Sequence, residues 1–323
     1  MSKPIQSFLF LSLVLSCFSC KKQKQSSPLI FQSNGKDRLY YLHRPPSLGS
    51  NSPLLFVLHG LGGTASGIRE YSQMDAVANK YGFAVCYPQG TGGTKNTRYT
   101  KKGDTFWNVG YETHKHETVD DVSFIVSLAT YLQKEYDLDP EKTFCSGMSN
   151  GGDMSYLLGC EASDIFRAIA PITGCMMKRV YDLCNKNDPI PVFHVHGTAD
   201  KTTLYNGDEN NRDKWGAYMG VETAIRFWVE RNECIESITD TLPDVDKNDG
   251  SVVVTEKHIG GKNNNEVWFY KVIGGDHEWP PGWPRGSGNG DLNTSEEIWR
   301  FFQYTIDTQD YSVSYTHLRA HET

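Results

Sequence analysis

The sequence predicts an α/β domain with a mainly parallel central sheet and helices on both faces. Short apolar runs without polar alternation stop at glycine, as in LLFVLHG (Leu54–Gly60) and IPVFHVHG (Ile190–Gly197). This pattern is typical of strands that are buried on both faces. Helix-like segments alternate with these runs, which favours parallel strands joined by helices. Since no internal repeat or interdomain linker interrupts the alternation, we expect a single domain over residues 31–311.

The expected elements follow in chain order. The predicted strands are Leu54–Gly60, Phe83–Pro88, KTFCSG at 142–147, FRAIAPITG at 166–174, Ile190–Gly197 and VWFYKVIGG at 267–275. The predicted helices are Glu70–Lys80, a helix from Thr118, one through MSYLLGC at 154–160, VETAIRFWVER at 221–231 and a C-terminal helix from Thr294.

Two of these helices have capping patterns at their start. TVDD places Thr118 at a cap position with Asp121 three residues later, and Thr294 precedes Glu297 in the same way. We expect Asp120 and Asp121 to favour the helix N-terminus through their charge. The apolar face of the helix from Thr118 is predicted to comprise Val119, Val122, Val126, Ala129 and Leu132.

The N-terminal segment is predicted to direct export. Residues 5–18 read IQSFLFLSLVLSCF, an apolar run of signal-peptide length that is short for a membrane span. It ends in VLSCFSCKK, which resembles a bacterial lipobox with Cys17 or Cys20 as the lipidated residue. An ordinary cleaved signal peptide is the alternative. We therefore expect a signal peptide over residues 1–20 and a polar tether over 21–30, with no membrane contact beyond a lipid anchor.

Composition excludes one class of partner. The formal net charge is −7, and the one basic cluster, KKQKQ, lies in the N-terminal segment. Nucleic-acid binding needs a basic surface, so we expect no nucleic-acid partner. At the other end, residues 312–323 lack apolar periodicity and resemble a translated sequencing adapter, so we exclude them from the fold prediction.

The remaining cysteines fall into two groups. Cys86 and Cys145 lie inside apolar strand patterns and are predicted to be buried thiols. The others lie at element ends or in loops, where disulfides of an exported protein are plausible. These four are Cys160, Cys175, Cys184 and Cys234. They allow three pairings, and the sequence does not choose among them.

One short motif suggests a nucleophile. SGMSNGG contains G-x-S-x-G with Ser149 between Gly147 and Gly151, after a predicted strand and before a predicted helix. In that context the serine occupies a strained turn, and the glycines provide clearance for the helix. Taken alone the motif is also compatible with an ordinary turn.

A serine hydroxyl needs a base, and the base needs an orienting acid. HGTAD places Asp200 just beyond one strand, and GGDHEWP places His277 just beyond another. The order Ser149, Asp200, His277 is the order of the α/β-hydrolase triad. For the oxyanion, HGLGGT offers a backbone N–H, predicted to be that of Leu61, and the helix start offers that of Asn150.

The same motifs resemble, in order, the polyhydroxybutyrate depolymerase/feruloyl esterase-like family of secreted serine esterases, which includes carbohydrate esterase family 1. The resemblance covers about residues 54–302 and implies Ser149 as nucleophile, Asp200 as acid and His277 as base. Its motifs are HGLGG, YPQG, WN, VDDVSFI, SGMSNGGDMS, FRAIAPITG, PVFHVHGTAD, GGDHEWP and SEEIWRFF. Asp276 departs from the family, which more often has glycine there, so the basicity of His277 or the rim of the site is expected to differ.

Other polar and aromatic residues receive structural predictions. His194 and His196 alternate on a strand and are expected to be packed core histidines. A local cluster of Glu112, His114, His116 and Glu117 is expected to be a solvated loop, not a metal site. Trp279 and Trp283 either line an acyl or sugar site or anchor their loop.

The sequence thus predicts an exported serine carboxylesterase that needs no cofactor or metal and releases feruloyl or acetyl groups from plant cell-wall polysaccharide. A polyhydroxybutyrate or related polyester is the alternative substrate, and a peptidase on the same fold is a third possibility. The alternative from another class is a non-catalytic, surface-tethered glycan-binding lipoprotein.

Overall fold

A computed structural model describes residues 27–184, 189–282 and 288–320, with side chains up to residue 308. The predicted signal peptide, with Cys17 and Cys20, and most of the tether lie outside the described residues. Trp283 also lies outside them. Within the described part, none of the helices is both long and apolar enough to cross a bilayer.

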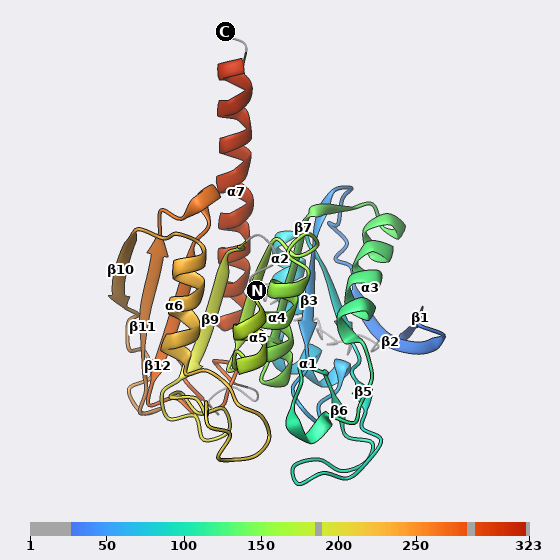
Figure 1. Cartoon of the computed structure of the whole chain (residues 1–323). Coiled ribbons are helices and arrows are strands. Elements are labelled where there is room, and N and C mark those ends of the chain that lie inside the picture. Colours follow the sequence, from blue (N-terminus) through green and yellow to red (C-terminus); the bar gives the residue numbers. More distant parts are fainter. Residues whose placement is uncertain (1–26, 185–188, 283–287, 321–323) are drawn as a thin grey trace, which may run out of the picture.

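The domain is built on one large sheet in the order β1-β2-β4-β3-β7-β8-β9-β12-β11-β10 (Figure 1). Its six central strands run parallel, from β4 to β12. These strands are β3 (Ser52–Leu58), β4 (Ala84–Pro88), β7 (Leu138–Met148), β8 (Ala168–Ile172), β9 (Val192–Gly197) and β12 (Val267–Ile273). Each overlaps one of the predicted strands, and the prediction of a mainly parallel sheet is confirmed.

Both edges of the sheet are antiparallel, and the sequence analysis did not predict them. The edge strands are β1 (Leu29–Ser33), β2 (Lys36–His43), β10 (Glu236–Thr241) and β11 (Val252–Ile259). They are rich in polar residues because their outer faces are exposed, and every residue of β10 is exposed. The β1–β2 turn is formed by Asn34 and Gly35 at positive φ, a hairpin signal that was present in the sequence.

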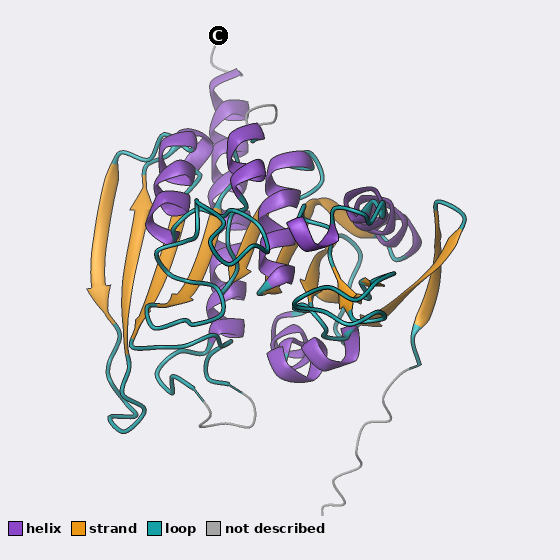
Figure 2. Cartoon of the chain, turned by 60° about the horizontal axis from the view of Figure 1, so that its bottom comes forward, coloured by secondary structure: helices purple, strands orange, loops and turns teal. Residues whose placement is uncertain are grey.

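Helices cover both faces, as predicted (Figures 1 and 2). One face packs against α3 (Asp121–Glu135), α4 (Asn150–Glu161), α5 (Lys178–Leu183) and α6 (Val221–Arg231). The other packs against α1 (Ala65–Ser72), α2 (Met74–Tyr81) and α7 (Thr294–Ala320). Short elements complete the chain: β5 (Thr91–Gly92), β6 (Thr105–Phe106), η1 (Glu112–His114) and η2 (Lys262–Asn264). The long loops after β4 and β9 both hang below the sheet in Figure 1.

One predicted helix and two predicted helix caps are wrong in detail. The segment predicted as one helix over 70–80 forms two, which break at Gln73 because its backbone is left-handed, with φ 54°. The third helix is capped by Asp120, whose side chain accepts the Ser123 N–H, and not by Thr118. The last helix begins at Thr294, as predicted, but Asn293 caps it by accepting the Glu296 N–H.

The buried face of α3 also differs from the prediction. It comprises Asp121, Phe124, Ile125, Leu128, Ala129 and Leu132, while Val122 and Val126 are only partly buried. Asp121 enters the interior because Arg38 of β2 binds its carboxylate at 2.7 Å. Burial raises the pKa of Asp121 although Arg38 opposes that shift. Asp121 therefore joins the helix to the sheet edge, a role beyond its predicted charge effect.

The cysteines resolve into one disulfide and four free thiols among the described residues. Cys160 at the end of α4 is bonded to Cys184 after α5. Of the four bridge candidates, Cys175 and Cys234 are free. Cys86 and Cys145 are buried free thiols, as predicted.

The last helix continues through residue 320 and extends beyond the sheet in Figure 1. Its final turns therefore include part of the tail 312–323. The adapter origin of that tail stays a prediction, as do the domain boundaries.

Candidate active site

The turn between β7 and α4 holds Ser149 in a strained conformation. Its φ is 54° and its ψ is −124°, a combination that an L-residue rarely adopts. The surrounding backbone fixes it there, because the Ser149 N–H donates to Ile172 O of the neighbouring strand at 2.9 Å. The turn therefore presents the serine at the carboxyl edge of the sheet, as expected for a nucleophile.

The two flanking glycines permit this turn by close backbone contact. A Cβ on Gly147 would lie 2.4 Å from Gly151 O. A Cβ on Gly151 would lie 2.4 Å from Leu58 O and 2.7 Å from His59 O. Such distances are shorter than any tolerated contact, so the helix approaches the strands as predicted only because these residues lack side chains.

The loop after β3 lies close to the same serine. A Cβ on Gly60 would lie 3.3 Å from Ser149 Cβ. The loop is held by Gly62 N–H, which donates to Thr105 O at 2.7 Å, and by Gly63 N–H, which donates to Gly60 O at 3.0 Å. Within the described residues the N–H groups of Leu61 and Asn150 donate to no other group. Both are therefore available for an oxyanion, and that role stays a proposal.

Asn150 has a second function that the sequence analysis missed. Its side chain accepts the Trp107 N–H at 2.7 Å and donates to Trp107 O at 3.1 Å. The Trp107 indole in turn donates to His59 O at 2.9 Å. These bonds connect the first turn of α4 to the loop after β3 through a third loop. The WN motif at Trp107 was the available signal.

His59 lies buried behind that loop as a neutral acceptor. Its Nδ1 lies 2.7 Å from Gly60 O, and its Nε2 accepts the Gly90 N–H at 2.9 Å. Gln89 Nε2 lies 3.0 Å from the same nitrogen. Burial lowers the pKa of His59 to about 4, although the bond to Gly60 opposes this shift. The HG motif after β3 and the PQG motif after β4 are thus joined by the contacts of His59 with Gln89 and Gly90.

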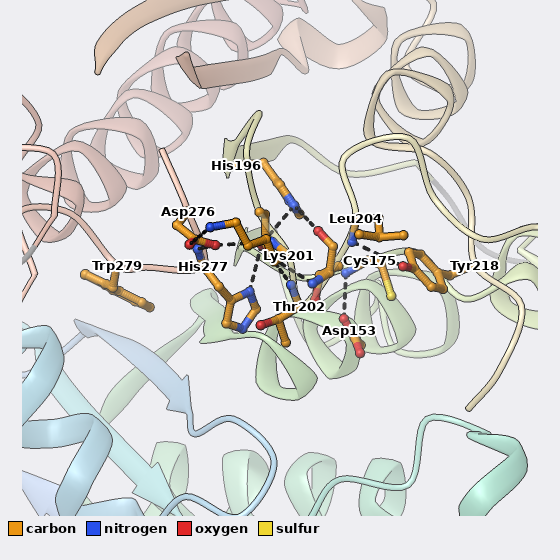
Figure 3. Close-up of polar contacts among 12 residues, drawn as sticks. Asp153, Cys175, His196, Lys201, Thr202, Leu204, Tyr218, Asp276, His277 and Trp279 are labelled. Carbon is orange, nitrogen blue, oxygen red and sulfur yellow. Dashed lines mark hydrogen bonds and ion pairs between the residues drawn. The ribbon is translucent and has the colours of Figure 1, made fainter. Parts of the chain in front are cut away.

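Asp200 and His277 meet beyond the ends of β9 and β12. His277 Nδ1 lies 2.7 Å from Asp200 Oδ2 (Figure 3). Since an ionised carboxylate only accepts, Nδ1 carries the proton and Nε2 is left as the acceptor nitrogen. That is the tautomer that a general base for a serine hydroxyl requires. The Ser149 hydroxyl itself makes no hydrogen bond within the described part of the chain, whether to His277 or to another group.

The Asp200 carboxylate is buried and held on both oxygens. Its Oδ1 accepts the N–H groups of Thr202 and Thr203, each at 2.8 Å. Burial raises the pKa of Asp200, but the bonds from His196 and His277 outweigh it and leave the pKa well below the usual range. The carboxylate therefore remains ionised and able to orient the imidazole.

The unusual Asp276 ties the two triad loops together. Its Oδ1 accepts the backbone N–H of Lys201 at 3.2 Å and that of His277 at 2.9 Å. Burial raises the pKa of Asp276, but these two bonds outweigh burial and lower it. The carboxylate thus contacts the backbone of His277 and not its ring. Figure 3 shows Asp276 between Lys201 and His277 at the rim.

The predicted aromatic rim is corrected at Trp279. This side chain is 2 % exposed, and its indole donates to Ser295 Oγ at 3.0 Å. It packs in the core between the sheet and α7, so it anchors its loop and cannot contact substrate. In Figure 3 it lies apart from the His277 ring.

The histidine predictions have mixed outcomes. His194 and His196 are buried, as expected for core histidines. His114, expected in a solvated loop, is 2 % exposed and packs on Phe106 with ring centroids 4.1 Å apart. His116 pairs with Glu117 at 3.0 Å. In the region covered by the structure, no group of three or more His, Cys, Asp or Glu side chains is placed to hold a metal ion.

Comparison with known proteins finds relatives that are named as esterases. A model of the prolyl oligopeptidase family (Peptidase_S9) matches residues 69–219. Feruloyl esterase D of Neurospora crassa is 28% identical over 83% of this chain and 82% of its own length. A bifunctional acetylxylan esterase/xylanase of Neocallimastix patriciarum is 27% identical over 61% of this chain. Poly(3-hydroxyalkanoate) depolymerase C of Paucimonas lemoignei is 25% identical over 67%.

The chain spans only 27% of the length of the Neocallimastix protein and 52% of that of the depolymerase. Among solved structures, an acetyl xylan esterase of Aspergillus awamori matches 86% of this chain and 100% of its own, with a TM-score of 0.57 and 14% identity. That similarity shows the α/β-hydrolase fold. Together with the order of the motifs, these matches show that the chain is similar to proteins named feruloyl esterase, acetylxylan esterase and polyhydroxyalkanoate depolymerase.

Proposed function

We propose that the chain is a serine carboxylesterase that works through an acyl-enzyme. The observation that carries this proposal is the 2.7 Å contact between His277 Nδ1 and Asp200 Oδ2. These two residues and Ser149, which is held at positive φ, all follow the carboxyl ends of parallel strands of one sheet. The relatives named as feruloyl esterase, acetylxylan esterase and polyhydroxyalkanoate depolymerase all act on carboxylic esters by name.

Each residue has a defined step in this mechanism. Ser149 Oγ attacks the ester carbonyl while His277 Nε2 takes its proton, and Asp200 stabilises the imidazolium. The N–H groups of Leu61 and Asn150 receive the negative charge of the tetrahedral intermediate. His277 then returns the proton to the departing alcohol. Water, activated by the same imidazole, finally releases the acid and regenerates Ser149.

The proposed substrates are feruloyl or acetyl esters of plant cell-wall polysaccharide, supported by the names of the relatives. A hydroxyalkanoate polyester is the alternative, favoured by the depolymerase relative. The aromatic rim no longer supports the choice, since Trp279 is buried. Release rates from methyl ferulate, acetylated xylan and a hydroxybutyrate oligomer would rank the three substrates directly.

We also propose that the protein is exported, with or without a lipid anchor. The Cys160–Cys184 disulfide supports export, because such bonds persist in oxidising compartments. The apolar run at residues 5–18 supports it independently. Globomycin treatment of cells that express the whole chain would leave a lipoprotein unprocessed and an ordinary signal peptide cleaved.

The test of the esterase is Ser149→Ala on a p-nitrophenyl ester. We expect kcat to fall by at least about 10³-fold, since the other triad members cannot replace the nucleophile. Ser155→Ala is the matched control, because Ser155 lies on the helix that Ser149 precedes. Among the described residues its hydroxyl contacts Gly151 O and Cys145 Sγ, and activity should persist. A fluorophosphonate probe should label the wild type and not Ser149→Ala. An unlabelled wild type would indicate the glycan-binding alternative.

A further inference from the structure

Three buried side chains form a row behind Asp200. The Tyr156 hydroxyl lies 3.0 Å from His194 Nδ1, and His194 Nε2 lies 3.2 Å from His196 Nδ1. His196 Nε2 lies 2.9 Å from Thr203 O and 3.3 Å from Asp200 Oδ2. The three side chains come from α4 and β9, and each residue is at most 1 % exposed. The row therefore ends on the same carboxylate oxygen that binds His277.

The chemistry of these atoms fixes where the protons lie. Both neighbours of His196 Nε2 are acceptors, a carbonyl and a carboxylate, so Nε2 must carry hydrogen. In a neutral ring, His196 Nδ1 is then an acceptor and takes a hydrogen from His194 Nε2. His194 Nδ1 becomes an acceptor in turn and receives the Tyr156 hydroxyl. All donors thus point one way, from Tyr156 toward Asp200.

Burial keeps His194 and Tyr156 uncharged. It lowers the pKa of His194 well below the usual value, and the neighbouring His196 lowers it further. The Tyr156 hydroxyl is also kept protonated, since burial raises its pKa well above the usual value. Because neither group exchanges protons near neutral pH, His194 keeps one donor nitrogen and one acceptor nitrogen.

We propose that His196 is a positioning residue for the triad, held as a donor to Asp200 by His194 and Tyr156. The proposal rests on the proposed function of Asp200. Its Oδ1 is fixed by two backbone N–H groups, while Oδ2 faces His277. A second donor on Oδ2 fixes the plane of the carboxylate and so the direction of the His277 ring. It also reduces the basicity that Oδ2 presents to His277.

Several titratable groups face His196 and enter the expected pH dependence. They are His194 on the same strand, Asp200 and Tyr205 on the following loop, and Lys271, which is paired in register on β12. Lys271 is ion-paired with Glu222 and Glu256, so its charge is offset. Asp200 is the group whose charge acts on the base. With one donor fewer, it holds a proton on His277 more tightly.

The test compares four variants on p-nitrophenyl acetate. In His196→Phe we expect kcat to fall on the order of 10- to 100-fold with KM nearly unchanged, the usual effect of losing a hydrogen bond to a charged group. The acid limb of kcat/KM against pH should move to higher pH. His196→Gln, which keeps a donor at the Nε2 position, should restore activity to within about 5-fold of wild type. Tyr156→Phe should lower kcat on the order of 3- to 10-fold.

Tyr270→Phe is the matched control for loss of a buried tyrosine hydroxyl. Tyr270 lies on the other face of the sheet and donates to Glu297 of α7 at 3.1 Å, so kcat and the acid limb should stay unchanged. A folded His196→Phe with wild-type kcat and acid limb would overturn the proposal. If that variant does not fold, either of two results overturns the proposal. One is a Tyr156→Phe variant with wild-type kcat, and the other is a His196→Gln variant that folds but is inactive. Lack of ester hydrolysis by the wild type would instead refute the proposed function.

Discussion

Gly151 faces the end of β3 so closely that the site depends on its missing side chain. The Cβ of Gly151→Ala would lie 2.4 Å from Leu58 O, a backbone atom that cannot move aside. We expect the free energy of unfolding to fall by about 2–3 kcal/mol, as for other overpacked positions. Ester hydrolysis should fall as well, because Leu58 and His59 lead directly into the Leu61 loop. Urea denaturation and p-nitrophenyl acetate turnover measure the two effects.

Gly49→Ala is the control for Gly151→Ala, since its Cβ would meet nothing nearer than Ser52 Oγ at 4.0 Å. It should leave both stability and turnover nearly unchanged. Equal behaviour of the two variants would show that the close approach at Gly151 has no consequence.

At this scale the sequence predicted the triad candidates because each lies at a strand end within a short motif. It could not predict the bonds among His59, Trp107 and Asn150, or the row from Tyr156 to Asp200. Those contacts join residues far apart in the chain, and their partners depend on strand order. Trp279 shows the converse error: an aromatic residue beside the base suggested a substrate rim, but packing against α7 buries it.

At the scale of elements, the Cys160–Cys184 bond joins the end of α4 to the end of α5 across 24 residues of sequence. Replacing both cysteines with alanine should lower the free energy of unfolding by about 3 kcal/mol, since the bond restricts the unfolded chain. Denaturation with and without dithiothreitol measures this effect. The reductant should destabilise the wild type and leave the double variant unchanged. A wild type insensitive to reductant under denaturing conditions would contradict this prediction.

The burial of each element explains which elements could be predicted from the sequence. Central strands are buried on both faces, so their apolar runs were conspicuous, and α6 was predicted with its correct bounds. The edge strands are half exposed and carry no such run. Predicted helix caps were wrong where a better capping residue stood close by: Asp120 caps α3 in place of Thr118, and Asn293 caps α7 in place of Thr294.

For the whole molecule, the sheet divides the interior into two cores, and the candidate site lies where loops from several strands meet at one edge. Fixing that edge requires buried polar groups, and the neutral histidines His59 and His194 are among them. Asp153, whose pKa burial raises to about 6, is another. The stability of the protein should therefore depend on pH in a way that these groups determine.

His59 provides the clearest test of that dependence. The unfolded chain protonates it near its ordinary pKa of 6.5, whereas the folded protein does so only near 4, so the unfolded state binds the extra proton between these values. Stability is thus lost as the pH falls through this range, whereas Asp153 contributes in the opposite direction. His59→Gln retains an acceptor for the Gly90 N–H and does not titrate. Between pH 7 and 4.5 we expect it to lose about 2 kcal/mol less of its free energy of unfolding than the wild type, by urea denaturation at each pH. Parallel curves for the two proteins would show that His59 is not buried in its neutral form, because Asp153 and His194 are common to both.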